Sequence, residues 1–129
     1  MNQSERPLRI LIAEDDALIA MDLADTLEAL GYAVVGPVAS VAAALAQAED
    51  ITSPLDGALL DLDLRGELSH PVANALDRRG VPFAFTSGYA AEMIDPAFQA
   101  HPCLLKPIEQ AMLVSVLKAF GSGERAAAG

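Results

Sequence analysis

Five side chains that could act together on a phosphoryl group lie at the ends of short apolar runs in this sequence. Glu14 and Asp15 follow the first run, Asp61 ends the third, Ser87 follows the fourth and Lys106 follows the fifth. If the runs are parallel strands, their carboxyl ends meet at one edge of a sheet, where such sheets bind their ligands. The pattern therefore predicts that carboxylates, a hydroxyl and an ammonium group converge at one edge.

The acidic members of this group are expected to hold a divalent cation. Carboxylates a few ångströms apart repel one another and need a counter-charge. Hard oxygen ligands with open water positions suit Mg²⁺, or Mn²⁺ in its place. Glu14 and Asp15 are adjacent, so one can bind the metal while the other holds a metal-bound water. Asp61 adds a third oxygen, and the backbone carbonyl of Asp63 can add a neutral one.

The same set of residues can compensate the charge of a phosphoryl group in transfer. Such a group carries negative charge on its equatorial oxygens. The cation, the Lys106 ammonium, and the Ser87 hydroxyl with a nearby backbone N–H offer partners for these oxygens. Asp61 then remains as the nucleophile, because a carboxylate can form an aspartyl phosphate.

The elements that position these residues alternate between strand and helix. Short apolar runs bounded by polar or turn residues predict strands. Helical spacing of apolar residues, with caps such as Ser40 and stops such as Gly31 and Gly80, predicts helices. Strands are expected at 8–13, 33–38, 58–61, 81–85 and 103–105, and helices at 17–30, 41–48, 71–79 and 108–120. The stretch 62–69 has no clear period and is expected to be a loop, and 89–99 is weakly helical.

This alternation predicts an α/β fold in which helices cover both faces of a doubly wound parallel sheet. The length of 129 residues fits one domain. We expect an N-terminal extension at 1–7, the domain at 8–120 and a flexible tail at 121–129.

The composition limits the partners that the protein could bind and the cellular compartments in which it could function. A formal net charge of −10 with only eight basic residues disfavours binding to nucleic acid. The single cysteine, Cys103, excludes an intrachain disulfide. The N-terminus lacks the layout of a signal peptide and no apolar run is long enough to cross a membrane, so a cytoplasmic location is expected. His70 and His101 each precede a proline and are expected to be turn or cap residues.

In order and position, the residues at the strand ends resemble those of response regulator receiver domains of two-component systems. The stretches 61–67 and 85–89 are similar to the subfamily with a Phe-Ala-Thr-Gly signature, in which Ser87, not Thr86, would fill the hydroxyl position. The resemblance implies a flavodoxin-like (βα)5 fold with strand order 2-1-3-4-5. It also implies a phosphoprotein whose Asp61 accepts a phosphoryl group from a sensor histidine kinase, and a cis peptide bond between Lys106 and Pro107.

The sequence departs from the receiver pattern at the residues that usually report phosphorylation. Receivers usually carry Tyr or Phe three residues before the lysine, whereas this chain has Cys103. Tyr89 is the candidate substitute, so Tyr89 and Cys103 are the switch candidates. The stretch between Ser87 and Lys106 is also short, and we expect 89–99 to become ordered on phosphorylation.

The leading interpretation is therefore a stand-alone receiver in a two-component phosphorelay. It would switch a protein-interaction surface for an unknown downstream protein or act as a phosphate sink, as a monomer or a weak homodimer and without contact to a membrane.

Two other classes of protein remain open. The Asp61-x-Asp63 motif resembles that of haloacid-dehalogenase-like phosphatases, although there the motif follows the first strand and the acidic pair comes last. The third possibility is a binding module that has lost phosphorylation.

Overall fold

The computed structural model describes residues 6–88, 96–98 and 100–121. Its main sheet consists of five parallel strands in the order β2-β1-β3-β6-β7. Their bounds are β1 Arg9–Ala13, β2 Ala33–Val38, β3 Gly57–Asp61, β6 Phe83–Ser87 and β7 Cys103–Leu105. When the small hairpin β4–β5 is set aside, this is the expected order 2-1-3-4-5, and the flavodoxin-like α/β fold is confirmed.

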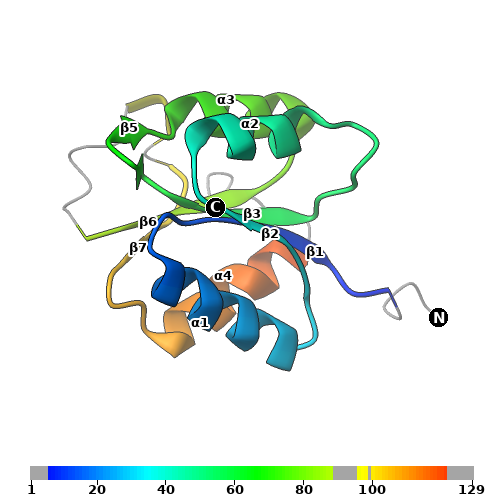
Figure 1. The fold of residues 1–129 in the computed structure, drawn as a ribbon. Helices are drawn as coiled ribbons and strands as arrows, with labels where there is room; N and C mark the ends of the chain where they lie inside the picture. The colour runs from blue at the N-terminus through cyan, green and yellow to red at the C-terminus, as the bar shows by residue number, and fades with distance from the viewer. Residues whose placement is uncertain (1–5, 89–95, 99, 122–129) are drawn as a thin grey trace.

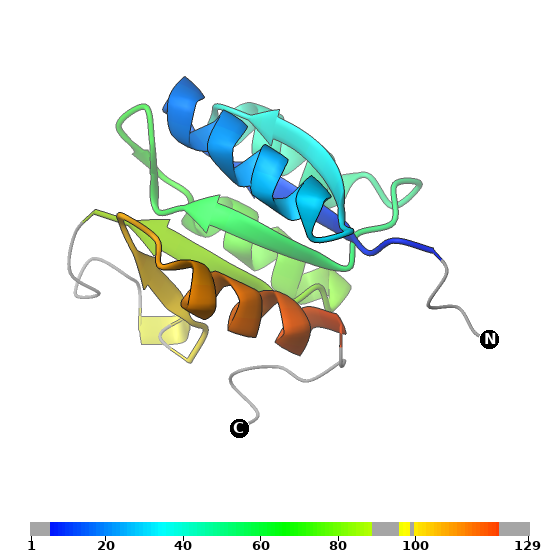
Figure 2. The same cartoon turned by 90° about the horizontal axis from the view of Figure 1, so that it is seen from below.

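Helices cover both faces of the sheet, as Figure 1 shows with the sheet seen nearly edge-on. Helices α2 (Val41–Glu49) and α3 (His70–Arg79) lie on one face. Helices α1 (Ala17–Ala29) and α4 (Gln110–Gly121) lie across the other face, which is turned toward the viewer in Figure 2. Within the described residues, no helix is both long and apolar enough to cross a membrane.

Two apolar clusters hold these layers together, one on each face of the sheet. Because side chains alternate along a strand, Leu59 and Leu60 of β3 enter different clusters. All five residues of β3 are buried, as expected for the central strand of a parallel sheet covered on both faces. The strand that ends at Asp61 is therefore fixed on both sides by packing.

The helix starts follow the capping residues of the sequence. Asp16 accepts hydrogen bonds from the backbone N–H groups of Leu18 and Ile19, at 3.0 and 3.1 Å, and so caps α1. Ser40 caps α2 through the N–H of Ala43, at 3.1 Å. Capping by Asp16 fixes where α1 begins, and this places Glu14 and Asp15 in the short connection between β1 and α1.

Edge strand β2 also fixes the start of this connection. Its register against β1 shifts between Leu11 and Ala13, so that the Glu14 N–H donates to the Val38 carbonyl at 2.9 Å. Gly36 allows the irregularity, because it has a φ of +93° and a Cβ there would lie 3.1 Å from the Ile12 carbonyl oxygen. The backbone of Glu14 is thereby held by β2.

Three sequence predictions of secondary structure are wrong by two or more residues. The fourth main strand spans Phe83–Ser87 rather than 81–85, and the last helix begins at Gln110 rather than at 108. The stretch 62–69, expected to be a loop, contains the antiparallel strands β4 (Asp63–Leu64) and β5 (Glu67–Leu68).

Other predictions lie wholly or partly outside the described residues. Of the weakly helical stretch 89–99, the structure describes Pro96–Phe98, which form a short 3-10 helix. The extension at 1–7 and the tail at 121–129 stay predictions, although Gly121 still belongs to α4.

The contact between Gly57 and Phe120 couples β3 to α4. A Cβ at residue 57 would lie 2.8 Å from Phe120 Cγ and closer still to Cδ2. We expect Gly57→Ala to lower the free energy of unfolding by about 2 kcal/mol, because the ring must move within a packed core. Urea denaturation measures this loss.

Two further variants give this prediction its controls. Gly88→Ala adds a Cβ that meets nothing within 4 Å, so it should leave the free energy of unfolding nearly unchanged. Phe120→Leu should recover part of the loss when it is combined with Gly57→Ala. Equal stability of Gly57→Ala and wild type would contradict the proposed contact.

Candidate functional site

The acidic residues predicted from the strand ends do converge. One ligand oxygen from each of Glu14, Asp15 and Asp61 lies within 4.8 Å of the others. Glu14 and Asp61 are buried, with 2% and 5% of their surfaces exposed, and Asp15 is the most exposed of the three. The arrangement brings the ends of β1 and β3 together at one edge of the sheet.

Lys106 places its ammonium group between the two buried carboxylates. Its Nζ lies 2.8 Å from Glu14 Oε1 and 2.9 Å from Asp61 Oδ2. The backbone N–H of Lys106 donates to the Ser87 carbonyl at 2.8 Å. This hydrogen bond fixes the backbone from which the Lys106 side chain reaches the site. The peptide bond between Lys106 and Pro107 is cis, as the family resemblance implied.

Burial and the neighbouring charges shift the pKa values of Glu14 and Lys106. Burial raises the pKa of the Glu14 carboxyl, the ion pair with Lys106 opposes this rise, and the negative charge of Asp61 adds to it. Burial alone lowers the pKa of the Lys106 ammonium, but its contacts with the two carboxylates outweigh burial, so its pKa is raised. The site thus stabilises a positive charge at this position.

The second oxygens of both buried carboxylates accept backbone hydrogen bonds. Glu14 Oε2 accepts from the Asp16 N–H at 2.9 Å, and Asp61 Oδ1 accepts from the Asp63 N–H at 3.2 Å. Both side chains are therefore oriented by their own local backbone. Oxygen ligands of this kind, close together and only partly neutralised by one ammonium, fit Mg²⁺ or Mn²⁺.

Ser87 and Thr86 are both buried at the end of β6. Ser87 is the last residue of the strand, and its carbonyl holds the Lys106 backbone. The Thr86 carbonyl instead accepts from the Leu62 N–H at 2.9 Å, just after Asp61. The structure therefore brings Ser87 to the same edge as the acidic cluster, and its role there stays a prediction.

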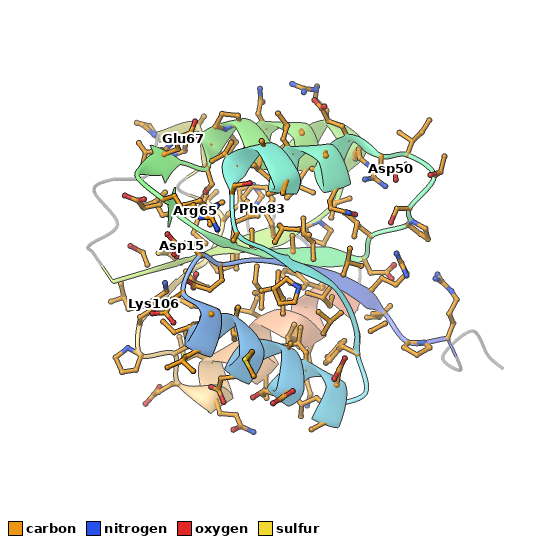
Figure 3. The ribbon with its side chains drawn as sticks, in the orientation of Figure 1. Asp15, Asp50, Arg65, Glu67, Phe83 and Lys106 are labelled. Carbon is orange, nitrogen blue, oxygen red and sulfur yellow. The ribbon has the colours of Figure 1, made fainter. Side chains whose placement is uncertain are left out.

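The hairpin β4–β5 contributes a contact that the sequence analysis missed. The backbone N–H of Arg65 donates to Asp15 Oδ2 at 2.8 Å. Figure 3 shows Arg65, Asp15 and Lys106 at the same end of the sheet, with Asp50 at the opposite end. Gly66 was a possible signal, since glycine favours tight turns, but nothing in the sequence connects residue 65 with residue 15.

The structure describes only one of the two switch candidates, Tyr89 and Cys103. Tyr89 lies outside the described residues. Cys103 is half-buried and packs against the apolar cluster on the α2 and α3 face. Burial raises the pKa of its thiol, so Cys103 has the environment of a packed side chain and not of a reactive thiolate.

The histidines predicted as turn or cap residues also pack in the aromatic part of the core. His70 begins α3 and stacks on Phe98, with ring centroids 5.8 Å apart. His101 is buried, stacks on Phe83 at 3.9 Å and lies 3.4 Å from Asp77. These contacts are distant in sequence, and no local pattern could have indicated them.

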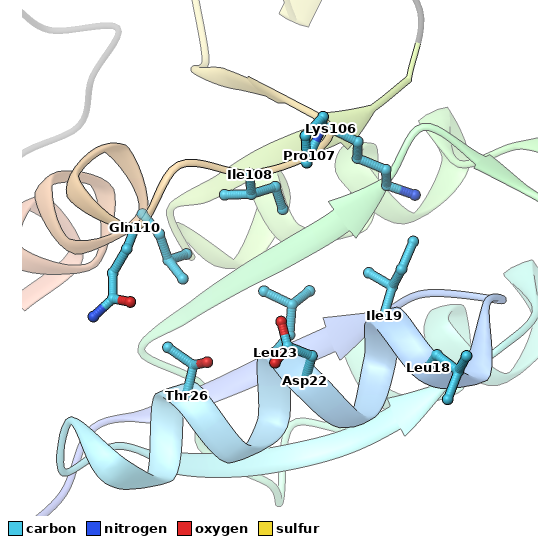
Figure 4. Close-up of a pocket in the computed structure, with 10 residues that line it drawn as sticks. Leu18, Ile19, Asp22, Leu23, Thr26, Lys106, Pro107, Ile108 and Gln110 are labelled. Carbon is cyan, nitrogen blue, oxygen red and sulfur yellow. The ribbon is translucent and has the colours of Figure 1, made fainter.

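A groove of about 350 Å³ opens beside the site, between α1 and the segment that follows β7. Ile19 and Leu23 of α1 line one side, and Lys106, Pro107 and Ile108 line the other (Figure 4). Lys106 therefore borders both this groove and the acidic cluster.

Comparison with known proteins identifies related structures. No family model matches the chain, and neither does any curated protein. The solution structure of SdrG from Sphingomonas melonis Fr1 is 44% identical, covers 88% of this chain and 96% of that chain, and has a TM-score of 0.77. The BeF3-activated conformation of SdrG from Pseudomonas melonis Fr1 is also 44% identical, with coverage of 86% and 93% and a TM-score of 0.71.

A more distant structure shares the same architecture. The CheY-like response regulator receiver domain protein from Methanospirillum hungatei JF-1 is 25% identical, with coverage of 92% and 97% and a TM-score of 0.78. The similarity to SdrG, at 44% identity, covers 88% of this chain, and SdrG is a single-domain response regulator. The chain therefore belongs to the family of response regulator receiver domains.

Proposed function

We propose that this receiver accepts a phosphoryl group on Asp61 from a sensor histidine kinase, in a reaction that depends on Mg²⁺. The observation that carries the proposal is the position of Lys106 Nζ, within 2.9 Å of both Glu14 and Asp61 in a buried cluster of carboxylates. Such a cluster has a high affinity for positive charge, and phosphoryl transfer requires positive charge beside the acceptor.

In the proposed reaction, an Asp61 carboxylate oxygen attacks the phosphorus of a phosphohistidine. A phosphorus–oxygen bond forms, the phosphorus–nitrogen bond breaks, and the imidazole leaves with the electron pair of that bond. When it is bound, Mg²⁺ supplies positive charge to the phosphoryl oxygens. Glu14 and Asp15, with Asp61 and the Asp63 carbonyl, would hold the ion.

Lys106 and Ser87 would compensate the remaining charge of the transferred group. The Lys106 ammonium already contacts Asp61 Oδ2 at 2.9 Å, so it would need only a small movement to contact a phosphoryl oxygen. The Ser87 hydroxyl would donate to another oxygen. Ser87 is buried and the Lys106 side chain is 19% exposed, and fixed charges and dipoles act more strongly in such a site than in water.

The output of the switch is a change in a protein-interaction surface, or the removal of phosphate from the kinase without further output. The region from 89 to 99, with Tyr89 and Cys103, is the proposed responding region. A cytoplasmic location, where a kinase could reach Asp61, belongs to the same proposal. We do not favour a haloacid-dehalogenase-like phosphatase, because the Asp61-x-Asp63 motif follows β3 and not the first strand.

Phosphotransfer from a radiolabelled sensor kinase to the wild-type chain tests this function. With Mg²⁺ present, we expect label to move to the chain in a linkage that alkali and hydroxylamine cleave, as expected for an acyl phosphate. Excess EDTA should prevent the transfer. An alkali-stable linkage, transfer unaffected by EDTA, or steady turnover of small phosphate esters would contradict the proposal.

A further inference from the structure

The β4–β5 hairpin contains a strained residue beside the acidic cluster. Its two-residue loop is formed by Arg65 and Gly66, with φ values of +54° and +86°. Positive φ at both loop residues is the geometry of a type I′ hairpin turn. Glycine adopts it freely, whereas for arginine it costs about 1 kcal/mol or more. Strained residues of this kind are often found at functional sites, where the surrounding structure holds them.

Two hydrogen bonds connect this hairpin to the proposed metal-binding carboxylates, and a third lies within the hairpin. The Arg65 N–H donates to Asp15 Oδ2 at 2.8 Å, across 50 residues of sequence. Within the hairpin, Asp63 Oδ1 accepts from the Gly66 N–H at 2.7 Å. At its base, the Asp63 N–H donates to Asp61 Oδ1 at 3.2 Å. The hairpin therefore contacts one carboxylate from β3 and one from the end of β1.

We propose that the β4–β5 hairpin is a positioning element of the cation site, in which the backbone N–H of Arg65 holds the Asp15 carboxylate ready to bind. This inference rests on the proposed function. Asp15 is the most exposed of the three acidic side chains, so it has the most conformational freedom to lose when a cation binds. One oxygen bonded to Arg65 leaves the other oxygen available to the ion, and an outer partner of this kind orients a ligand.

The coupling between the order of the hairpin and cation binding must act in both directions. If an ordered hairpin strengthens cation binding, then a bound cation must stabilise the hairpin by the same factor. The hairpin tip is exposed at Arg65, Gly66 and Glu67. A change in the order of the hairpin would therefore alter the surface of the protein. The hairpin would thus respond to occupancy of the cation site as well as support it.

Mg²⁺ titration of two variants at residue 65 tests the proposal. Arg65→Pro removes the N–H and cannot adopt the positive φ, whereas Arg65→Asn keeps the N–H and tolerates that φ. Both variants remove the same positive charge, so they are matched for long-range electrostatics. We expect Arg65→Pro to bind Mg²⁺ about tenfold more weakly than wild type. We expect Arg65→Asn to bind at least as tightly as wild type.

A second pair of variants is independent of residue 65. Asp63→Ala removes the acceptor for the Gly66 N–H, whereas Asp63→Asn keeps an acceptor oxygen, and both variants lose the charge. The proposal expects weaker Mg²⁺ binding by Asp63→Ala than by Asp63→Asn. Urea denaturation without metal should show that all four variants fold, because Arg65 is exposed and Asp63 is only partly buried. If Arg65→Pro fails to fold, the Asp63 pair decides.

Amide hydrogen exchange provides a readout that general destabilisation would not produce. In the wild type, Mg²⁺ should slow exchange at Arg65 and Gly66, and Asp15→Asn should weaken this protection. If wild type binds Mg²⁺ but exchange at both amides is unchanged and the variants in each pair bind equally, the positioning role is wrong while the proposed function stands. If the wild type does not bind Mg²⁺ at all, both proposals are wrong.

Discussion

Asp61→Asn should accept no label from a sensor kinase under conditions in which the wild type is labelled. Asparagine keeps the shape of the side chain and one acceptor oxygen for the Asp63 N–H, but its amide is not a nucleophile. The fold should survive, because Lys106 keeps its 2.8 Å ion pair with Glu14. Removing one of two neighbouring buried carboxylates also relieves their mutual repulsion. Phosphotransfer and urea denaturation measure the two effects separately.

Asp56→Asn provides the matched control for this substitution. Asp56 immediately precedes β3, at the opposite end from Asp61, and its Oδ2 accepts from the Arg9 N–H at 2.8 Å. It makes the same chemical change on the same segment but away from the site, so labelling should remain at the wild-type level. Labelling of Asp61→Asn comparable to that of Asp56→Asn would show that the phosphoryl group is accepted elsewhere.

Lys106→Met should destabilise the metal-free protein by about 3 kcal/mol at neutral pH, because the loss of one partner leaves buried charge uncompensated. The substitution removes the ammonium that contacts Glu14 Oε1 and Asp61 Oδ2 but keeps most of the side-chain volume. Mg²⁺ should recover much of this loss. It should also bind more tightly than in the wild type, because no fixed cation remains beside the site.

The same variant should accept the phosphoryl group more slowly, because Lys106 no longer compensates its charge. The combination of tighter metal binding and slower transfer separates a role in transfer from a general loss of structure.

Lys118 is the other lysine of the chain and provides the control for this prediction. It lies exposed on α4, so Lys118→Met should change the free energy of unfolding by less than about 0.5 kcal/mol, with no dependence on Mg²⁺. Urea denaturation of both variants with Mg²⁺ and with EDTA gives the comparison. Equal stability of Lys106→Met and Lys118→Met without metal would contradict the role of Lys106 as counter-charge to the two carboxylates.

The sequence predicted that the acidic residues and Lys106 converge, because their convergence depends on topology more than on local detail. Alternating strands and helices imply parallel strands, and parallel strands bring Glu14, Asp61 and Lys106 to one edge whatever the loops do. The burial of β3 and the caps at Asp16 and Ser40 follow from local patterns in the same way. These parts of the fold were therefore accessible without coordinates.

The missed boundary at β6 has a local physical cause. The Val81 N–H donates to the Leu76 carbonyl, and Gly80, with φ of +72°, donates to Asp77. Val81 thus completes the C-terminal cap of α3 and does not begin the strand. Pro82 has no N–H to donate to a neighbouring strand, so pairing begins at Phe83. The apolar run alone could not distinguish the cap from the strand.

The hairpin was missed for a different reason. Asn-Gly and Asp-Gly are the usual sequence signs of a two-residue hairpin, and Arg65-Gly66 is not among them. Its unfavourable backbone geometry is accompanied by a contact with Asp15, which is a tertiary interaction. The aromatic contacts of His70 and His101 with Phe98 and Phe83 are likewise tertiary. Such contacts join residues that are distant in the sequence, so they become visible only in the folded structure.

The two outermost strands of the sheet limit how copies of the chain can associate. On one side, β2 carries Pro37, which cannot donate a backbone hydrogen bond, and on the other, β7 has only three residues. Edge strands that are short or contain proline discourage the addition of strands from another molecule. The net charge of −10 adds electrostatic repulsion between copies. Association through a continuous intermolecular β-ladder is therefore disfavoured.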